Sequence, residues 1–163
     1  MSGNNSEELY NVLEELGFDF YTGVPCSMLS GIIELLTDNN KYLSATREDE
    51  AIGIAVGAYL AHKKPVVLMQ NSGFCNSIGH IKSLVNLYCI PVLFIISMRG
   101  YEGDACEHDG MIEITNRLLS DLNLPSVEIK EGNPTQSNID NIKLFIKAIV
   151  NGSGCSAAIL VMK

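Results

Sequence analysis

Residues 91–97 read Pro-Val-Leu-Phe-Ile-Ile-Ser, and this almost wholly apolar run decides the fold. A second run, residues 65–70 (Pro-Val-Val-Leu-Met-Gln), has the same character. Strands that are apolar on both faces are typical of parallel sheets covered by helices on both sides, because neither face meets water. Segments between such runs carry apolar residues at helical spacing. The alternation of strands and helices therefore predicts an α/β domain.

We expect a single three-layer domain built on a mainly parallel, six-stranded sheet with helices on both faces. The strands are expected at residues 18–22, 42–45, 65–70, 91–97, 126–129 and 157–162. Helices are expected at residues 7–16, 27–36, 48–62, 76–88, 110–122 and 139–151, with a turn at 71–73. The polar residues 1–6 are expected to be disordered. We find no repeat or linker that would divide the chain.

The composition narrows the class of protein. The 163 residues are 47% hydrophobic and only 18% charged, with a net charge of −8. This indicates a globular domain, part of whose surface is covered by a partner. The eleven Lys and Arg residues are spread along the chain, which argues against nucleic-acid binding. No apolar run approaches about 20 residues, so we expect no membrane span. No secretory signal is visible at the N-terminus.

The cysteines do not form a recognisable disulfide or zinc pattern. Their number is odd, their spacing is wide, and no C-x-x-C occurs among Cys26, Cys75, Cys89, Cys106 and Cys155. Reduced thiols fit a cytoplasmic protein. We expect Cys89 to lie in the core.

The helix predicted at residues 48–62 has an unusual composition. Residues 45–59 read Ala-Thr-Arg-Glu-Asp-Glu-Ala-Ile-Gly-Ile-Ala-Val-Gly-Ala-Tyr, so three carboxylates precede a small and apolar helix. Such a helix is expected to be buried. Its acidic start then lies beside a dry interior, at the end of a strand, where open α/β sheets bind ligands. A carboxylate in that position suits proton-transfer chemistry.

Polar loops follow four of the predicted strands. They are residues 23–27 (Gly-Val-Pro-Cys-Ser), 46–48 (Thr-Arg-Glu), 70–76 (Gln-Asn-Ser-Gly-Phe-Cys-Asn) and 99–109, which contains Asp104, Glu107 and His108. Each loop alone also fits a turn followed by a helix cap. Parallel strands bring all four loops to one edge of the sheet, and together they indicate the rim of an active site.

The order of these motifs resembles a known enzyme family. Gly-Val-Pro, then Arg-Glu before a small-residue helix, then Gln-Asn-Ser-Gly, then Ile-Pro-Val-Leu-Phe-Ile-Ile-Ser-x-Arg-Gly is similar to thiamine-diphosphate-dependent 2-oxo acid decarboxylases. The narrower resemblance is to the pyrimidine-binding domain of sulfopyruvate and phosphonopyruvate decarboxylases. It covers residues 8–130 and, more weakly, the rest. Residues 24–26 and 46–48 are more similar to sulfopyruvate decarboxylase α subunits, whereas the Glu107-His108 loop is equally similar to the phosphonopyruvate enzymes. Residues 1–163 are thus expected to be one pyrimidine-binding domain.

The resemblance assigns the central role to Glu48. The family glutamate stands nine residues before a helix glycine, as Glu48 does before Gly57, and shares a proton with N1′ of the thiamine aminopyrimidine. Asp49 and Glu50 then serve the helix dipole or an interface. The resemblance also implies contacts with thiamine diphosphate from Gly23, Val24, Pro25, Asn71, Ser72 and Gly73.

The substrate implied by the resemblance is a three-carbon 2-oxo acid with a 3-sulfonate or 3-phosphonate. Arg47 and Arg99 are candidates for its anionic group, because guanidinium binds oxyanions through paired hydrogen bonds. Ion pairs with Glu48, Asp49, Glu102 or Asp104 are the alternative. Asn71 and Cys26 are further substrate-binding candidates, although Cys26 also fits an inert buried thiol. His108 is a candidate proton donor or anion contact, or else an ordinary loop histidine, whereas His62 and His80 are expected to have no chemical role.

One part of the family site is missing from the sequence. Thiamine-diphosphate enzymes hold the diphosphate through Mg²⁺ with Gly-Asp-Gly and a downstream Asn, but here Gly103-Asp104 is followed by Ala105. We therefore expect no metal ligands in this chain and a β subunit that holds Mg²⁺ and the diphosphate. The expected function is that of the α subunit of a decarboxylase that releases CO₂ and sulfo- or phosphonoacetaldehyde. The alternatives are a carboligase subunit or a non-catalytic α/β binding or scaffold protein.

Overall fold

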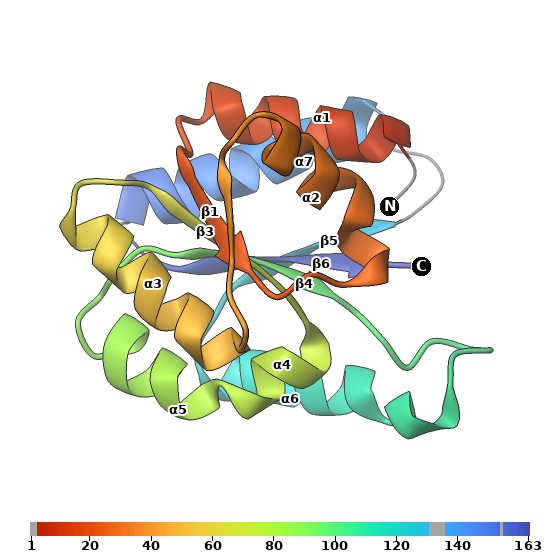
Figure 1. Cartoon of the computed structure of the whole chain (residues 1–163). Helices are drawn as coiled ribbons and strands as arrows, with labels where there is room; N and C mark the ends of the chain where they lie inside the picture. Colours follow the sequence, from red (N-terminus) through yellow and green to blue (C-terminus); the bar gives the residue numbers. More distant parts are fainter. Residues whose placement is uncertain (1–2, 131–135, 154) are drawn as a thin grey trace.

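A six-stranded sheet, parallel throughout, forms the centre of the molecule (Figure 1). The computed structural model describes residues 3–130, 136–153 and 155–163. The strand order is β2-β1-β3-β4-β6-β5. The strands are β1 (Phe20–Gly23), β2 (Tyr42–Ser44), β3 (Pro65–Gln70), β4 (Leu93–Ser97), β5 (Ser126–Lys130) and β6 (Ala157–Met162). The predicted α/β fold with a parallel sheet is confirmed.

Helices cover both faces of the sheet (Figure 1). One face carries α1 (Gly3–Glu15), α2 (Ser30–Asp38) and α7 (Gln136–Ile146); the other carries α3 (Glu48–Leu60), α4 (Asn71–Asn76), α5 (Ile78–His80) and α6 (Met111–Asp121). Short 3₁₀ turns are η1 (Ser27–Leu29) and η3 (Cys106–His108), and π-helical segments are η2 (Ile81–Asn86) and η4 (Lys147–Ser153).

Strand β4 holds the two layers together because it is buried on both faces. Leu93 and Ile95 belong to the core under α1, α2 and α7, whereas Phe94 and Ile96 belong to the core under α3, α4 and α6. All five residues of β4 are buried. Full burial of one such apolar side chain is worth about 1.5–3 kcal/mol, so each face of β4 contributes to packing.

Some predicted boundaries are right and others are wrong. β3 and β6 coincide with the predicted runs. The turn expected at 71–73 is wrong, because α4 begins at Asn71 directly after β3, with the extended Gln70 as its N-cap. The helices expected at 76–88 and 139–151 are interrupted, since each changes into a π-helical segment, η2 or η4.

Two local expectations also differ from the structure. Residues 1–6 were expected to be disordered, but α1 begins at Gly3, and Asn5 and Ser6 are buried. Asn5 Nδ2 donates to the Lys130 carbonyl at 3.3 Å, which ties α1 to the end of β5. Cys89 is exposed rather than in the core, because it follows η2 in a left-handed turn with φ of 51°. Among the described residues, no helix is long and apolar enough to cross a membrane.

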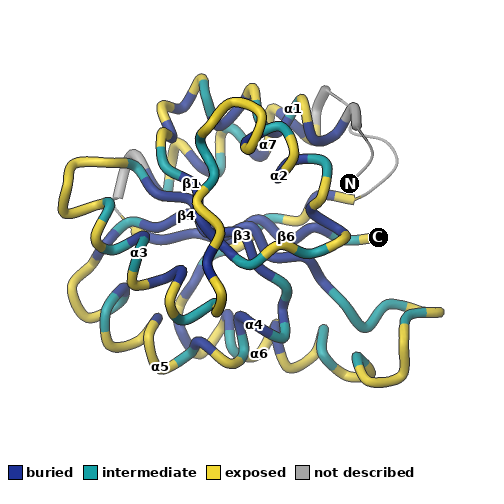
Figure 2. Tube along the Cα trace, in the orientation of Figure 1, coloured by how far each residue is buried: buried dark blue, intermediate teal, exposed yellow. Residues whose placement is uncertain are grey.

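Helix α3 was expected to be buried, but this chain covers it on one face only. Its buried residues are Ala51, Ile52 and Ala55. Figure 2 shows exposed stretches along α3. Gly53 and Gly57 are exposed, and Leu60 keeps 69% of its surface exposed. Because these three residues are spaced at i, i+4 and i+7, they form one line along the helix, which we call the exposed α3 stripe. This chain therefore buries only part of the apolar surface of α3.

Candidate active site

The four polar loops gather at one edge of the sheet because all the strands run in the same direction. The chain leaves β1 toward β2 on one side and later toward β3 on the other, so β1 and β3 form a topological switch point. Open α/β sheets bind ligands in the crevice outside the carboxyl ends of the strands at such a point. Residues 23–26 and 70–73 follow these two strands directly.

Glu48 projects from the start of α3 onto the first turn of α4. A Cβ atom at Gly73 would overlap Cγ, Cδ and Oε1 of Glu48, so only glycine at this position leaves room for the Glu48 side chain. The carboxylate borders a pocket of about 430 Å³ lined by Arg47, Glu48, Asp49, Asn76 and Ser77. Within the described ranges, no residue forms a hydrogen bond or ion pair with Glu48. Its oxygens are therefore available to a ligand.

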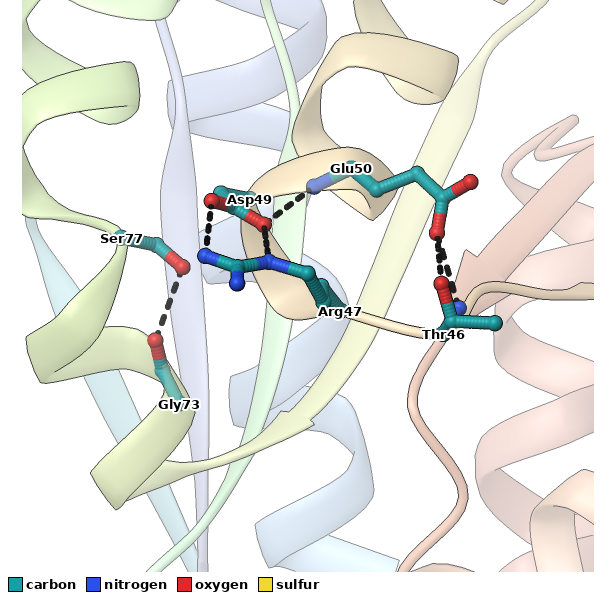
Figure 3. A network of polar contacts seen from close by, with 6 residues as sticks. All are labelled: Thr46, Arg47, Asp49, Glu50, Gly73 and Ser77. Carbon is teal, nitrogen blue, oxygen red and sulfur yellow. Dashed lines mark hydrogen bonds and ion pairs between the residues drawn. The ribbon is translucent and has the colours of Figure 1, made fainter.

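The two carboxylates that follow Glu48 are occupied by protein groups (Figure 3). Asp49 accepts two hydrogen bonds from Arg47, at 2.8 Å from Nη2 and 3.0 Å from Nε. The Arg47 guanidinium lowers the pKa of Asp49 to about 2. Glu50 Oε2 accepts from the Thr46 backbone N–H at 2.9 Å and the Thr46 hydroxyl at 2.6 Å, and these donors lower the pKa of Glu50. Both side chains thus stabilise the N-terminus of α3.

The loop after β1 is fixed by its neighbouring strands. A Cβ at Gly23 would overlap the Leu68 carbonyl, and Val24 N–H donates to that carbonyl at 3.2 Å. Pro25 is exposed. The half-buried Cys26 places Sγ 3.3 Å from the hydroxyl of Ser97 at the end of β4. Gly23 therefore allows the loop to lie directly on β3, and Cys26 faces the end of the sheet.

Asn71 connects the start of α4 to the loop after β4. This buried side chain donates from Nδ2 to the Arg99 carbonyl at 2.9 Å and accepts from the Arg99 backbone N–H at 3.2 Å. Ser72, the next residue, accepts at Oγ from Gln70 Nε2 at 2.8 Å. Residues 71–73 thus place Glu48 and the Arg99 backbone on either side of one helical turn.

The structure separates the remaining candidates. Arg47 is 76% exposed and paired with Asp49, so the ion-pair alternative describes it. Arg99 is only 22% exposed, and its Nε lies 3.5 Å from Asp104. His108 is half-buried in η3, and its carbonyl lies against Gly100. No hydrogen bond in the described part of the chain joins His108 to the Glu48 pocket.

Sequence reasoning placed Asn76 in the rim without giving it a role, and it missed Ser77 and Ser97. Asn76 and Ser77 line the Glu48 pocket, and the Ser77 hydroxyl donates to the Gly73 carbonyl at 2.8 Å (Figure 3). Ser77 lies four residues after Gly73, which is a helical spacing. Because we predicted a turn at 71–73, we did not expect these two residues to be in contact. Ser97 is the polar last residue of the predicted central strand, so its position at the carboxyl edge of the sheet could have been predicted.

These residues suit an aminopyrimidine ring. The Glu48 carboxylate, which has no protein partner in the described residues, provides an acceptor for a ring nitrogen at the border of a pocket of about 430 Å³. Within the described ranges, no group of three or more His, Cys, Asp or Glu residues is arranged to hold a metal ion.

Comparison with known proteins gives a consistent result. The profile described as "Thiamine pyrophosphate enzyme, N-terminal TPP binding domain" matches residues 4–117. The sulfopyruvate decarboxylase subunit alpha of Methanococcus maripaludis is 42% identical over 125 residues, which cover 75% of each chain. The phosphonopyruvate decarboxylase of Streptomyces viridochromogenes is 36% identical over 111 residues, 66% of this chain but 28% of that one.

Among solved structures, benzoylformate decarboxylase from Polynucleobacter necessarius superposes with a TM-score of 0.65 at 14% identity. The match covers 96% of this chain and 29% of that protein. At this identity the likeness concerns the fold alone. This chain thus spans less than a third of that enzyme, and it spans a similar share of the Streptomyces enzyme.

Proposed function

The chain belongs to the thiamine pyrophosphate enzymes through their N-terminal TPP-binding domain, and from this premise we propose that it is the α subunit of a 2-oxo acid decarboxylase. The proposed substrates are 3-sulfopyruvate and 3-phosphonopyruvate, and the products are CO₂ and the matching acetaldehyde. The observation that carries the proposal is the Glu48 carboxylate, which lies against Gly73 without a protein partner in the described residues.

In this proposal, Glu48 holds a proton between its carboxylate and N1′ of the thiamine aminopyrimidine. Gly23, Val24 and Pro25, together with Asn71, Ser72 and Gly73, are the residues that would hold the cofactor. When bound, thiamine diphosphate supplies the electron sink for loss of CO₂. Cys26 is proposed to contact the substrate directly and Asn71 through the Arg99 backbone that it bonds, and His108 is the proposed proton donor or anion contact.

The diphosphate and Mg²⁺ are proposed to be held by a β subunit. The described residues offer no metal-ligand cluster, and the relatives named subunit alpha imply a partner. The exposed α3 stripe supports this, because an apolar surface on the helix that begins with Glu48 is suited to a large permanent contact. None of the five cysteines forms a disulfide, which suits the reducing cytoplasm in which we propose that the enzyme works.

The proposed catalytic role is tested in the complex with the β subunit. CO₂ release is measured with 3-sulfopyruvate, thiamine diphosphate and Mg²⁺. Glu48→Gln keeps the size of the side chain but removes the acid–base group, so turnover should fall by about 10²- to 10⁴-fold while assembly persists. Glu50→Gln is the matched control, because Glu50 serves the helix N-terminus. A Glu48→Gln complex that keeps the wild-type rate would exclude this role.

The proposed interface is tested by co-purification. Leu60→Asp puts a charge on the exposed α3 stripe and should abolish capture of the β subunit while leaving the thermal unfolding of the chain unchanged. Leu144→Asp is the control, because Leu144 is similarly exposed, at 65%, on α7 at the opposite face. Equal loss of the β subunit in both variants would argue against the stripe as the interface.

A further inference from the structure

The three arginines of the chain differ in what their guanidinium groups contact. The Arg47 guanidinium donates two hydrogen bonds to Asp49, and Arg117 is exposed on α6. Arg99 is mostly covered, and its Nε is buried without a hydrogen-bond partner. In the described part of the chain, its only ionic neighbour is Asp104 Oδ2, at 3.5 Å from Nε. Arg99 thus keeps donors available at the end of β4.

Arg99 is held in place by its backbone rather than by its side chain. The Asn71 amide bonds both the N–H and the carbonyl of Arg99. Gly100 follows in a left-handed conformation with φ of 97°, and its N–H donates to Asp104 Oδ2 at 2.9 Å. This turn brings the Asp104 carboxylate, only 6% exposed, beside the guanidinium. The Arg99 backbone is therefore held in position, while its guanidinium Nε forms no hydrogen bond.

A second cation lies at the same level of the sheet. Ser97 pairs with Val161, and Met98 N–H continues the pairing by donating to the Val161 carbonyl at 2.9 Å. Beyond this pair β4 ends at Ser97 and β6 at Met162, and Lys163 follows β6 directly. The Lys163 ammonium donates to Tyr101 Oη at 3.2 Å, in the loop that follows Arg99. The carboxyl end of β4 and β6 thus carries two positive groups with one buried carboxylate.

We propose that Arg99 forms an oxyanion subsite that binds the tetrahedral 3-sulfonate or 3-phosphonate of the substrate, with Lys163 as the neighbouring cation. This inference rests on the proposed function. The planar guanidinium presents donors in a fork that matches oxyanions, which an ammonium does not. The path from Glu48 to Gly73 to Asn71 to Arg99 crosses one turn of α4, so one element positions the carboxylate and the anion subsite together. Arg47 takes no part in the subsite.

The test uses the complex with the β subunit and compares Arg99→Gln, Arg99→Lys, Arg47→Gln and the exposed control Arg117→Gln. Steady-state kinetics use 3-sulfopyruvate and 3-phosphonopyruvate, and calorimetry measures binding of 3-sulfopropionate, an unreactive sulfonate. A charged hydrogen bond is worth enough to raise KM and Kd by about 10- to 100-fold in Arg99→Gln, with little change in kcat. Arg99→Lys should recover part of the loss, and Arg117→Gln should stay within about twofold of wild type.

A fall in kcat with unchanged KM in Arg99→Gln would overturn the subsite, as would a larger KM effect of Arg47→Gln. Co-purification and circular dichroism establish that each variant folds and assembles. If Arg99→Gln does not fold or assemble, the KM of Arg99→Lys decides the question. Failure of the proposed function is a separate result, in which the wild-type complex releases no CO₂ from either substrate. Calorimetry with 3-sulfopropionate still reports the role of Arg99 in that case. Effects on only one of the two substrates would assign the subsite to sulfonate or to phosphonate.

Discussion

The substitution Gly73→Ala should displace the Glu48 side chain without destabilising the fold. The added Cβ would overlap Cγ, Cδ and Oε1 of Glu48. Carbon atoms pack at about 3.5–4.0 Å, so the Glu48 side chain must retreat by about 1 Å or more. It is free to do so, because it is half-buried and its carboxylate has no protein partner in the described residues. The backbone of α4 does not need to move.

The expected cost is therefore in rate and not in folding. Misplacement of a catalytic group by about 1 Å costs about 10²-fold, which corresponds to roughly 2.7 kcal/mol of transition-state stabilisation. Alanine is favoured over glycine inside a helix by up to about 1 kcal/mol, which offsets residual crowding. We expect the free energy of unfolding to stay within about 1 kcal/mol of wild type while CO₂ release by the complex falls by about 100-fold.

The assay pairs urea denaturation of the chain with turnover of the complex. Gly79→Ala is the matched control, because Gly79 is also helical and a Cβ there has nothing within 4 Å. In a double-mutant cycle, Gly73→Ala should add little to Glu48→Gln, since both act on the same carboxylate. A folded Gly73→Ala complex with the wild-type rate, or effects that simply multiply in the double variant, would refute the reasoning.

Three further predictions concern stability and ionisation. Asn71→Ala removes both bonds to the Arg99 backbone inside the protein and should lower the free energy of unfolding by about 2–4 kcal/mol in urea denaturation; a loss below about 0.5 kcal/mol would contradict the connecting role. Ser156→Ala leaves Val92 N–H and the Ile90 carbonyl without the buried hydroxyl that bonds both, at 3.1 and 2.9 Å, and should cost about 1–3 kcal/mol, whereas the exposed Ser83→Ala should cost little. The folded pKa of Asp49, about 2 against an ordinary 3.8, is depressed, so the Arg47 pair stabilises the fold above pH 3.8 and is lost as the pH falls toward 2. Carboxyl NMR titration should therefore find a midpoint near 2 that rises in Arg47→Gln, and a midpoint indifferent to Arg47 would disprove the pairing.

The sheet was predictable because burial on both faces leaves a direct mark on the sequence. β3 and β6 are continuous apolar runs, and their predicted limits coincide with the structure. The region from Asn71 to Asn86 was less predictable, since Asn, Ser and Gly favour turns and helix caps equally. Here α4 begins at once after β3 because the buried Asn71 amide has a distant partner, the backbone of Arg99. No periodicity in the sequence reveals such a bond.

The candidate site was predictable in its location and less so in its individual members. Glu48 followed from its spacing to Gly57 and a family resemblance, whereas its contact with Gly73 links residues on two different helices. The sequence did not distinguish Arg47 from Arg99, since both were candidates for the anionic group of the substrate. They differ in the structure because Asp49 lies two residues from Arg47 on the same helical turn, whereas Asp104 reaches Arg99 only through the turn at Gly100.

The error about α3 is itself informative. Small and apolar residues predict burial, yet Gly53, Gly57 and Leu60 remain exposed in the chain alone. A helix with apolar residues on every side is stable in water only when another surface covers it. The same helix begins with Glu48, whose carboxylate has no partner in the described residues. Because α3 turns by about 100° per residue, the exposed α3 stripe lies on the side of the helix away from Glu48, so a subunit that covers the stripe would bury α3 and would have to reach around the helix start to meet the Glu48 pocket.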